Sequence, residues 1–206
     1  MADFENSQEI PKIITFLSSL LQRVAETNDV FRHLDSQKIS IFHGLTRPTI
    51  SVYSYLQRIF KYANCSPSCY ITAYIYLDRF MKKQPLLPIN SFNVHRLLIT
   101  SVLVSAKYMD DIFYNNAYYA KVGGISRAEM NHLEVDFLFG LGFQLNVTPH
   151  TFHTYCCYIQ REMLQHSPPL PLHLPPSSNH DHYYINEDGS THQHQLPFQL
   201  IHNIVD

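Results

Sequence analysis

The chain has 206 residues, with 15 Lys or Arg, 17 Asp or Glu and a formal net charge of −2 at neutral pH. This length suits one domain with a tail rather than two full domains. The charge balance and the lack of a basic arm argue against nucleic-acid binding, and no uncharged run is long enough to suggest a membrane span.

Two amphipathic helices are predicted in the first third of the chain. Apolar residues recur at helical spacing from Ile10 to Glu26, and this is the strongest periodic signal in the sequence. After a loop, Thr46 and Pro48 are typical of a helix start. The second helix should therefore begin there and present residues such as Val52 and Ile59 on one side.

A third helix should begin at Ser66, a good N-cap, with Pro67 at its first position. Cys65 then lies outside this helix, so we do not expect its thiol on the same face as that of Cys69. The start of the chain is acidic and polar and does not resemble a signal peptide. We therefore expect the protein in the nucleus or the cytoplasm. In those compartments the four cysteines should be reduced, and such cysteines are commonly small buried apolar residues.

The stretch LLITSVLVSAK, which ends at Lys107, predicts a helix buried inside the protein and capped by Asn90 or Asn93. Ten uncharged residues precede the lysine, too many for an ordinary surface helix. A lysine at the end of such a helix needs either a path to water or a partner.

Three further helices are predicted before the composition changes. A short one spans about 117–122, and a capping box of Ser126 and Glu129 opens a longer one that ends near Leu141. A last helix covers about 148–165. Since the β-branched runs lie inside helical patterns, the fold class is expected to be all-α.

The helix that begins at the capping box contains an anomaly that matches Lys107. Its apolar stripe is complete except for Glu134. The pattern leaves two interpretations open. The two residues could form an ion pair that fastens two helices, which contributes little to stability. Alternatively, the pair lies at the rim of the core and offers hydrogen bonds to another protein, because one Glu cannot use all three donors of a Lys.

Four motifs, in this order, resemble a cyclin box: YIYLDRFMKK, LITSVLVSAKYMDD, NAYYAKVGGIS and EMNHLEVDFLFGLGFQL. With ITFLSSLLQRVAETND near the start, they are similar to the small single-box P- or U-type cyclins of plants, which are related to cyclins of fungal phosphate signalling. The resemblance covers about residues 10–163. It implies an N-terminal helix and linker (1–45) packed on a five-helix cyclin box (46–147), then a C-terminal helix (148–166). Residues 167–206 are rich in Pro and His and are expected to be mostly disordered.

The resemblance also implies a function without catalysis by this chain. Such a protein is a regulatory subunit that binds and activates a cyclin-dependent protein Ser/Thr kinase as a heterodimer, in cell-cycle or phosphate-linked control. In the family, residues matching Lys107 and Glu134 grip the kinase's mobile helix. We further expect Leu103, beside Lys107, and the loop aromatics Phe113 and Tyr114 to supply contact area, since aromatic residues are enriched at interfaces. The alternative is a cyclin-fold adaptor that binds another protein and activates no kinase.

Asp78 and Arg79 match family positions and are expected to form a structural pair within the box. His150, His153 and Cys157 share one helix face, but zinc normally takes four ligands and no fourth is evident, so no metal site is expected. No cofactor or small-molecule substrate is expected either.

Asp110 and Asp111 could be taken for a pair of catalytic carboxylates. Neighbours in sequence point in different directions, however, and both are therefore expected to be solvated loop residues.

Overall fold

The computed structural model describes residues 9–31 and 39–165. Within these ranges the chain forms seven helices and no strand, which confirms the predicted all-α class. The helices are α1 (Glu9–Phe31), α2 (Val52–Ala63), α3 (Pro67–Lys83), α4 (Val94–Met109), α5 (Asn116–Gly123), α6 (Arg127–Leu141) and α7 (Pro149–Gln165). The tail predicted for 167–206 lies outside the described residues.

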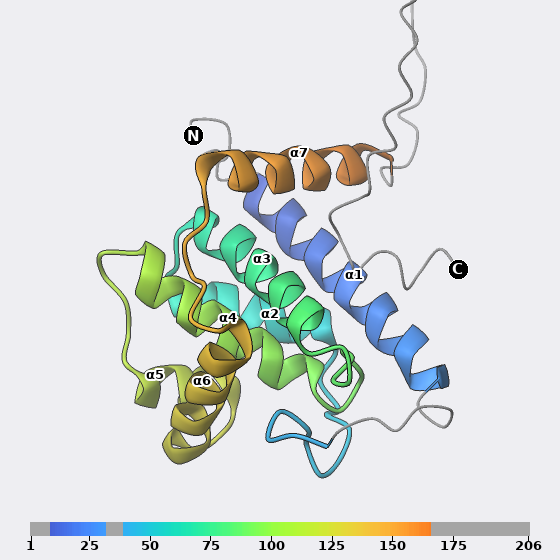
Figure 1. Ribbon diagram of the computed structural model, residues 1–206, viewed down its shortest axis with the longest axis vertical. Coiled ribbons are helices and arrows are strands. Elements are labelled where there is room, and N and C mark those ends of the chain that lie inside the picture. The colour runs from blue at the N-terminus through green and yellow to red at the C-terminus, as the bar shows by residue number, and fades with distance from the viewer. Residues whose placement is uncertain (1–8, 32–38, 166–206) are drawn as a thin grey trace, which may run out of the picture.

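Helix α4 is the centre of the fold. It packs against α2, α3, α5 and α6, and nearly all of its residues before Lys107 are buried. Helices α1 and α7 pack against each other on one side of the molecule, whereas α5 and α6 lie on the other (Figure 1). The end of α4 that carries Lys107 therefore emerges from the core beside α5 and α6.

Two of the predicted helix starts are confirmed by their hydrogen bonds. The Ser66 side chain accepts from the amide of Cys69, and Pro67 occupies the first helical position of α3. Ser126 and Glu129 form the complete capping box of α6. These starts depend on neighbours in sequence, which is why they could be predicted.

The predicted start of α2 was wrong. The helix begins after Ser51, whose side chain accepts from the amide of Ser54, and not at Thr46. Contacts with other parts of the chain hold the preceding segment in a loop. The amide of Gly44 donates to the carbonyl of Phe92, and the guanidinium of α4's Arg96 donates to two carbonyls within 41–43.

Asp78 and Arg79 on α3 contact different segments. The fully buried Asp78 carboxylate accepts from the hydroxyl of Tyr155 at 2.6 Å and pairs with Lys82 at 2.8 Å. Arg79 donates to two backbone carbonyls of the linker between α6 and α7, each at 2.9 Å. Both residues thus connect α3 to the C-terminal part of the described chain, each with partners of its own.

Candidate functional site

Lys107 and Glu134 form an ion pair, which both interpretations of the sequence require, and they meet at the surface. Lys107 lies in the last turn of α4, and its Nζ is 2.6 Å from Oε1 of Glu134 on α6. Their side chains remain 30 % and 14 % exposed. The pair therefore lies at the rim of the core, where a second molecule can reach it.

A third residue, Asn116 at the start of α5, completes the site and was missed by the sequence analysis. Its Nδ2 donates to Oε2 of Glu134 at 2.6 Å and to Oδ1 of Asn131 at 2.8 Å. Each carboxylate oxygen of Glu134 thus accepts from a different helix. In the described part of the chain, Lys107 donates to Glu134 alone. An ammonium group has three donors, so capacity remains for a further acceptor.

The loop between α4 and α5 exposes apolar side chains next to this pair. Phe113 is 47 % exposed and Tyr114 is 41 % exposed, and the ring of Tyr114 stacks on that of Tyr118 at 4.0 Å between centroids. Ile112 is also largely exposed. The loop follows directly after the turn that carries Lys107, so the cation and this apolar surface are neighbours.

The expectation that Leu103 contacts a partner was wrong. Leu103 was expected to supply contact area to a partner, but none of its surface is exposed. Helix α4 is surrounded by four other helices, so a position one turn before Lys107 still lies within the core. Leu103 therefore stabilises the helix that presents the lysine and cannot itself contact a partner.

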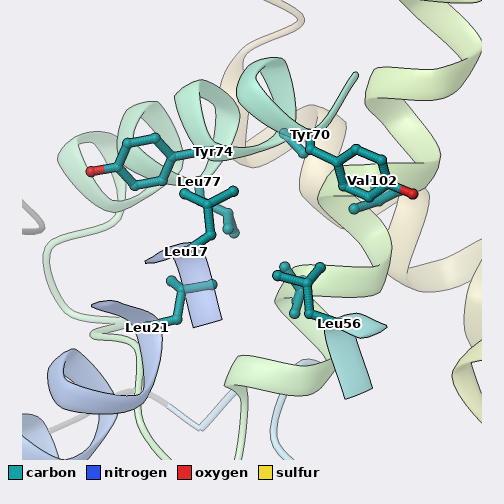
Figure 2. A pocket seen from close by; sticks show the side chains of 9 residues that line it. Leu17, Leu21, Leu56, Tyr70, Tyr74, Leu77 and Val102 are labelled. Atoms are coloured by element: carbon teal, nitrogen blue, oxygen red, sulfur yellow. The ribbon is translucent and has the colours of Figure 1, made fainter. Parts of the chain in front are cut away.

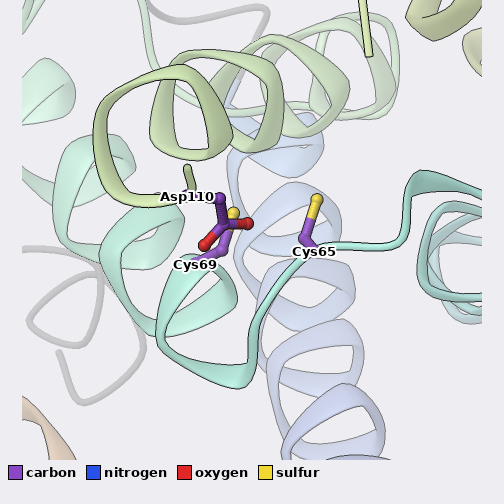
Figure 3. A group of neighbouring side chains, drawn as sticks. All are labelled: Cys65, Cys69 and Asp110. Carbon is purple, nitrogen blue, oxygen red and sulfur yellow. The ribbon is translucent and has the colours of Figure 1, made fainter. Parts of the chain in front are cut away.

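Two expectations about the neighbouring segment were also wrong. Asp110 is not simply solvated: its carboxylate accepts from the amide and hydroxyl of Ser66, at 3.1 and 2.6 Å. Cys65 does precede α3, yet its thiol lies close to that of Cys69 and to the Asp110 carboxylate (Figure 3). Both results arise from contacts between α3 and the end of α4, which sequence spacing does not show.

Among the described residues, the Cys65, Cys69 and Asp110 group alone brings three potential metal ligands together. On α7 the thiol of Cys157 lies 3.6 Å from a ring nitrogen of His153, but His150 does not complete a three-ligand group with them. His150, His153 and Cys157, which their spacing places on one helix face, therefore do not form a group of three metal ligands.

An internal cavity between α1, α2, α3 and α4 has apolar walls that include Leu17, Leu56 and Val102 (Figure 2). The hydroxyl groups of Tyr70 and Tyr74 point away from it (Figure 2). Its volume of about 10 Å³ is no more than one water molecule needs. It is therefore a packing defect and offers no ligand site.

Comparison with known proteins identifies the family. Residues 9–145 match the family model for cyclins, and this segment contains α1 to α6 together with Lys107, Asn116 and Glu134. The chain belongs to the cyclin family. The predicted resemblance is thus confirmed.

Proteins from plants are similar in sequence to this cyclin over most of its length. It is 63 % identical over 204 residues to cyclin-U4-1 of Arabidopsis thaliana, covering 97 % of this chain and 99 % of the relative. It is 56 % identical over 176 residues to cyclin-P4-1 of Oryza sativa subsp. japonica, covering 83 % of each. The P- or U-type assignment is confirmed.

Cyclins are regulatory subunits that partner cyclin-dependent kinases in general, and the prediction that this chain is not an enzyme is confirmed. None of the helices in the described residues is both long and apolar enough to cross a membrane.

Proposed function

We propose that this cyclin forms a heterodimer with a cyclin-dependent protein kinase and activates it by holding the kinase's mobile helix in its inward position. The observation that carries the proposal is the Lys107–Glu134 pair, which is anchored by a third helix, remains accessible and retains unused donors.

The geometry suits the end of a helix in a partner. The last carbonyls of a helix have no intrahelical donors, and the helix dipole places negative charge there. The ammonium group of Lys107 complements both features. Glu134 and Asn116 hold it in place, since the carboxylate is itself fixed from α5.

Activation follows from preferential binding. Kinase catalysis requires an ion pair between a strand lysine and a glutamate of the mobile helix. A cyclin that binds the inward position of this helix more tightly than the outward one raises the population of the active state. The exposed rings of Phe113 and Tyr114 would add buried apolar area beside the polar contact.

Co-purification with a cyclin-dependent kinase, combined with a histone phosphorylation assay, tests the proposal. We expect Lys107→Ala and Glu134→Gln to lose most binding and activation while their circular dichroism stays helical. Glu129→Gln is the matched control. Glu129 also pairs α6 with α4, through Arg96 at 2.8 Å, but it does so near the opposite end of α4. Glutamine also suits its place in the capping box.

Each outcome has a distinct meaning. If Glu129→Gln and Glu134→Gln weaken binding equally, the Lys107–Glu134 pair only fastens two helices. If the wild-type chain binds the kinase without raising its activity, the chain is an adaptor. Whether the kinase serves cell division or phosphate-linked control, in the nucleus or in the cytoplasm, would be tested by identifying the kinase that co-purifies from plant tissue and by imaging a fluorescent fusion.

A further inference from the structure

The connection between α2 and α3 brings two thiols together. The Sγ atoms of Cys65 and Cys69 and a carboxylate oxygen of Asp110 all lie within 4.8 Å of one another (Figure 3). Cys65 immediately precedes the N-cap of α3, and Cys69 lies in the first turn. A side chain just before an N-cap commonly folds back over that turn. The proposed kinase contact uses neither thiol.

The contacts of the group favour thiol chemistry over metal binding. Both oxygens of Asp110 already accept from Ser66. The Cys65 sulfur lies 3.2 Å from the hydroxyl of Tyr119, and the Cys69 sulfur is 3.7 Å from a backbone carbonyl of α4. A structural zinc site takes four ligands. A disulfide needs only two thiols, and the Sγ atoms of Cys65 and Cys69, within 4.8 Å of each other, are near enough to form one after a small side-chain movement.

We propose that Cys65 and Cys69 form a reversible disulfide when the protein encounters a hydroperoxide. The two thiols differ in the way this chemistry requires. Cys65 is partly exposed, whereas Cys69 is fully buried. Hydrogen bonds from the Cys69 thiol and the Tyr119 hydroxyl lower the pKa of Cys65. The hydrogen bond to Cys65 and burial raise the pKa of Cys69. Cys65 is therefore the first to react, because the thiolate is the nucleophile.

The reaction has two balanced steps. The Cys65 thiolate attacks one peroxide oxygen, an S–O bond forms, and the O–O bond breaks to release an alcohol, or water if the oxidant is hydrogen peroxide. The resulting sulfenic acid is then attacked by the sulfur of Cys69. An S–S bond forms, the S–O bond breaks, and the Cys69 proton leaves with the hydroxide as water. The peroxide takes two electrons from the thiols, and a dithiol reductant returns them by exchange.

Formation of the bond should disturb the end of α4. Two bonded sulfurs are about 2.05 Å apart, so one side chain must move. Cys69 is fixed in a buried helix, and Cys65 lies in a three-residue connection. Its movement displaces Ser66, whose amide and hydroxyl both bind Asp110. Asp110 begins the loop that carries Phe113. Any consequence for a kinase rests on the proposed function, so the experiments below use readouts that need no kinase.

Mass spectrometry of the full chain treated with hydrogen peroxide tests the chemistry. Trypsin releases residues 62–79 as one peptide that contains both thiols. We expect this peptide to lose the mass of two hydrogens and to regain it with dithiothreitol. Cys69→Ser should accumulate a sulfenic acid at Cys65 that dimedone traps, and Cys65→Ser should leave Cys69 unreacted. The exposed Cys157 serves as an internal standard.

Two results would overturn the disulfide. In the first, peroxide oxidises Cys157 while the 62–79 peptide keeps two alkylatable thiols. In the second, the purified chain carries one zinc per molecule and its thiols oxidise only after a chelator removes the metal. The second result would assign a metal site to the same residues.

Hydrogen exchange tests the coupling to the loop. We expect the oxidised chain to exchange faster than the reduced chain at the amide of Ser66 and in residues 110–115, with recovery after reduction. Asp110→Asn should shrink this difference because it weakens the Ser66 contacts in both states. Asp111→Asn, an exposed neighbour, is the matched control and should preserve the difference. Equal exchange in oxidised and reduced wild-type chains would disprove the coupling.

Discussion

Exchanging the charges of Lys107 and Glu134 separates the two roles that their contact could have. The doubly substituted chain, Lys107→Glu with Glu134→Lys, again places opposite charges on α4 and α6 at the same positions. If the pair serves only to join these helices, the double variant should behave like the wild type. If the ammonium group binds a partner, it must stand at position 107, and the double variant should then lose affinity for that partner.

The magnitudes for the two roles differ enough to be measured. The pair is partly exposed, at 30 % and 14 % of its side-chain surfaces. Such a pair contributes about 1 kcal/mol or less to the free energy of unfolding, and the double variant should recover most of what each single variant loses. A charge-assisted hydrogen bond to a partner is worth roughly 1.5–3 kcal/mol. Loss of the ammonium group at 107 should therefore weaken kinase binding about 10- to 100-fold.

Urea unfolding and isothermal titration with a purified cyclin-dependent kinase provide the two readouts. We expect the double variant to regain stability but not affinity, because a carboxylate at 107 would face the carbonyl oxygens of the partner's helix end. Recovery of both stability and affinity would refute a role for Lys107 in binding the kinase. The pair would then serve only to join α4 and α6. A salt titration of the wild-type affinity provides an additional check, since an exposed ionic contact weakens as ionic strength rises.

Three further predictions concern the fold that supports the site. Gly140→Ala places a Cβ in a steric clash with Cε2 of Phe80. The overpacking should lower the free energy of unfolding by about 1–3 kcal/mol. The higher helix propensity of Ala relative to Gly offsets about 1 kcal/mol of this loss. Urea midpoints should therefore fall, and Phe80→Leu in the same chain should restore part of the loss. Tyr155→Phe removes a hydrogen bond to the buried carboxylate of Asp78 and should lower the free energy of unfolding by about 1.5–3 kcal/mol; an unchanged urea midpoint would contradict the role assigned to this contact. Burial lowers the pKa of His95, so the native state holds it neutral while the unfolded chain protonates below about pH 6.5. Stability should fall as pH is lowered from 7 towards 5.5, and His95→Gln should flatten this dependence.

Local sequence rules predicted much of the helical framework. A serine N-cap depends on residues three positions away, and Ser66 and Ser126 both behave as their sequence context indicates. Helical periodicity also placed Lys107 and Glu134 on apolar faces. Because each was the single charge on such a face, their contact could be inferred before the helices were positioned.

Contacts between distant segments account for what could not be predicted. Ser66 and Asp110 are 44 positions apart, and their hydrogen bonds bring together the two thiols and the end of α4. Asn116 reaches Glu134 across 18 positions, from a helix whose own pattern is too short to fix its orientation. Leu103 illustrates a different limit. In a helix buried on every side, periodicity does not reveal which face ends at the surface.

The burial of α4 also bears on how Lys107 would act in a complex. A surface lysine is flexible, and ordering such a side chain on binding costs roughly 0.5–1.5 kcal/mol. Here the backbone of Lys107 is fixed by a helix packed on four sides, and its ammonium group is held at 2.6 Å by a carboxylate that Asn116 fixes in turn. Part of the ordering cost is thus met during folding rather than on binding. Under the proposed function, this arrangement also gives a reason for a cation at the end of a buried helix: the core supplies rigidity, and the last turn would present a donor that a partner could use without reorganising it.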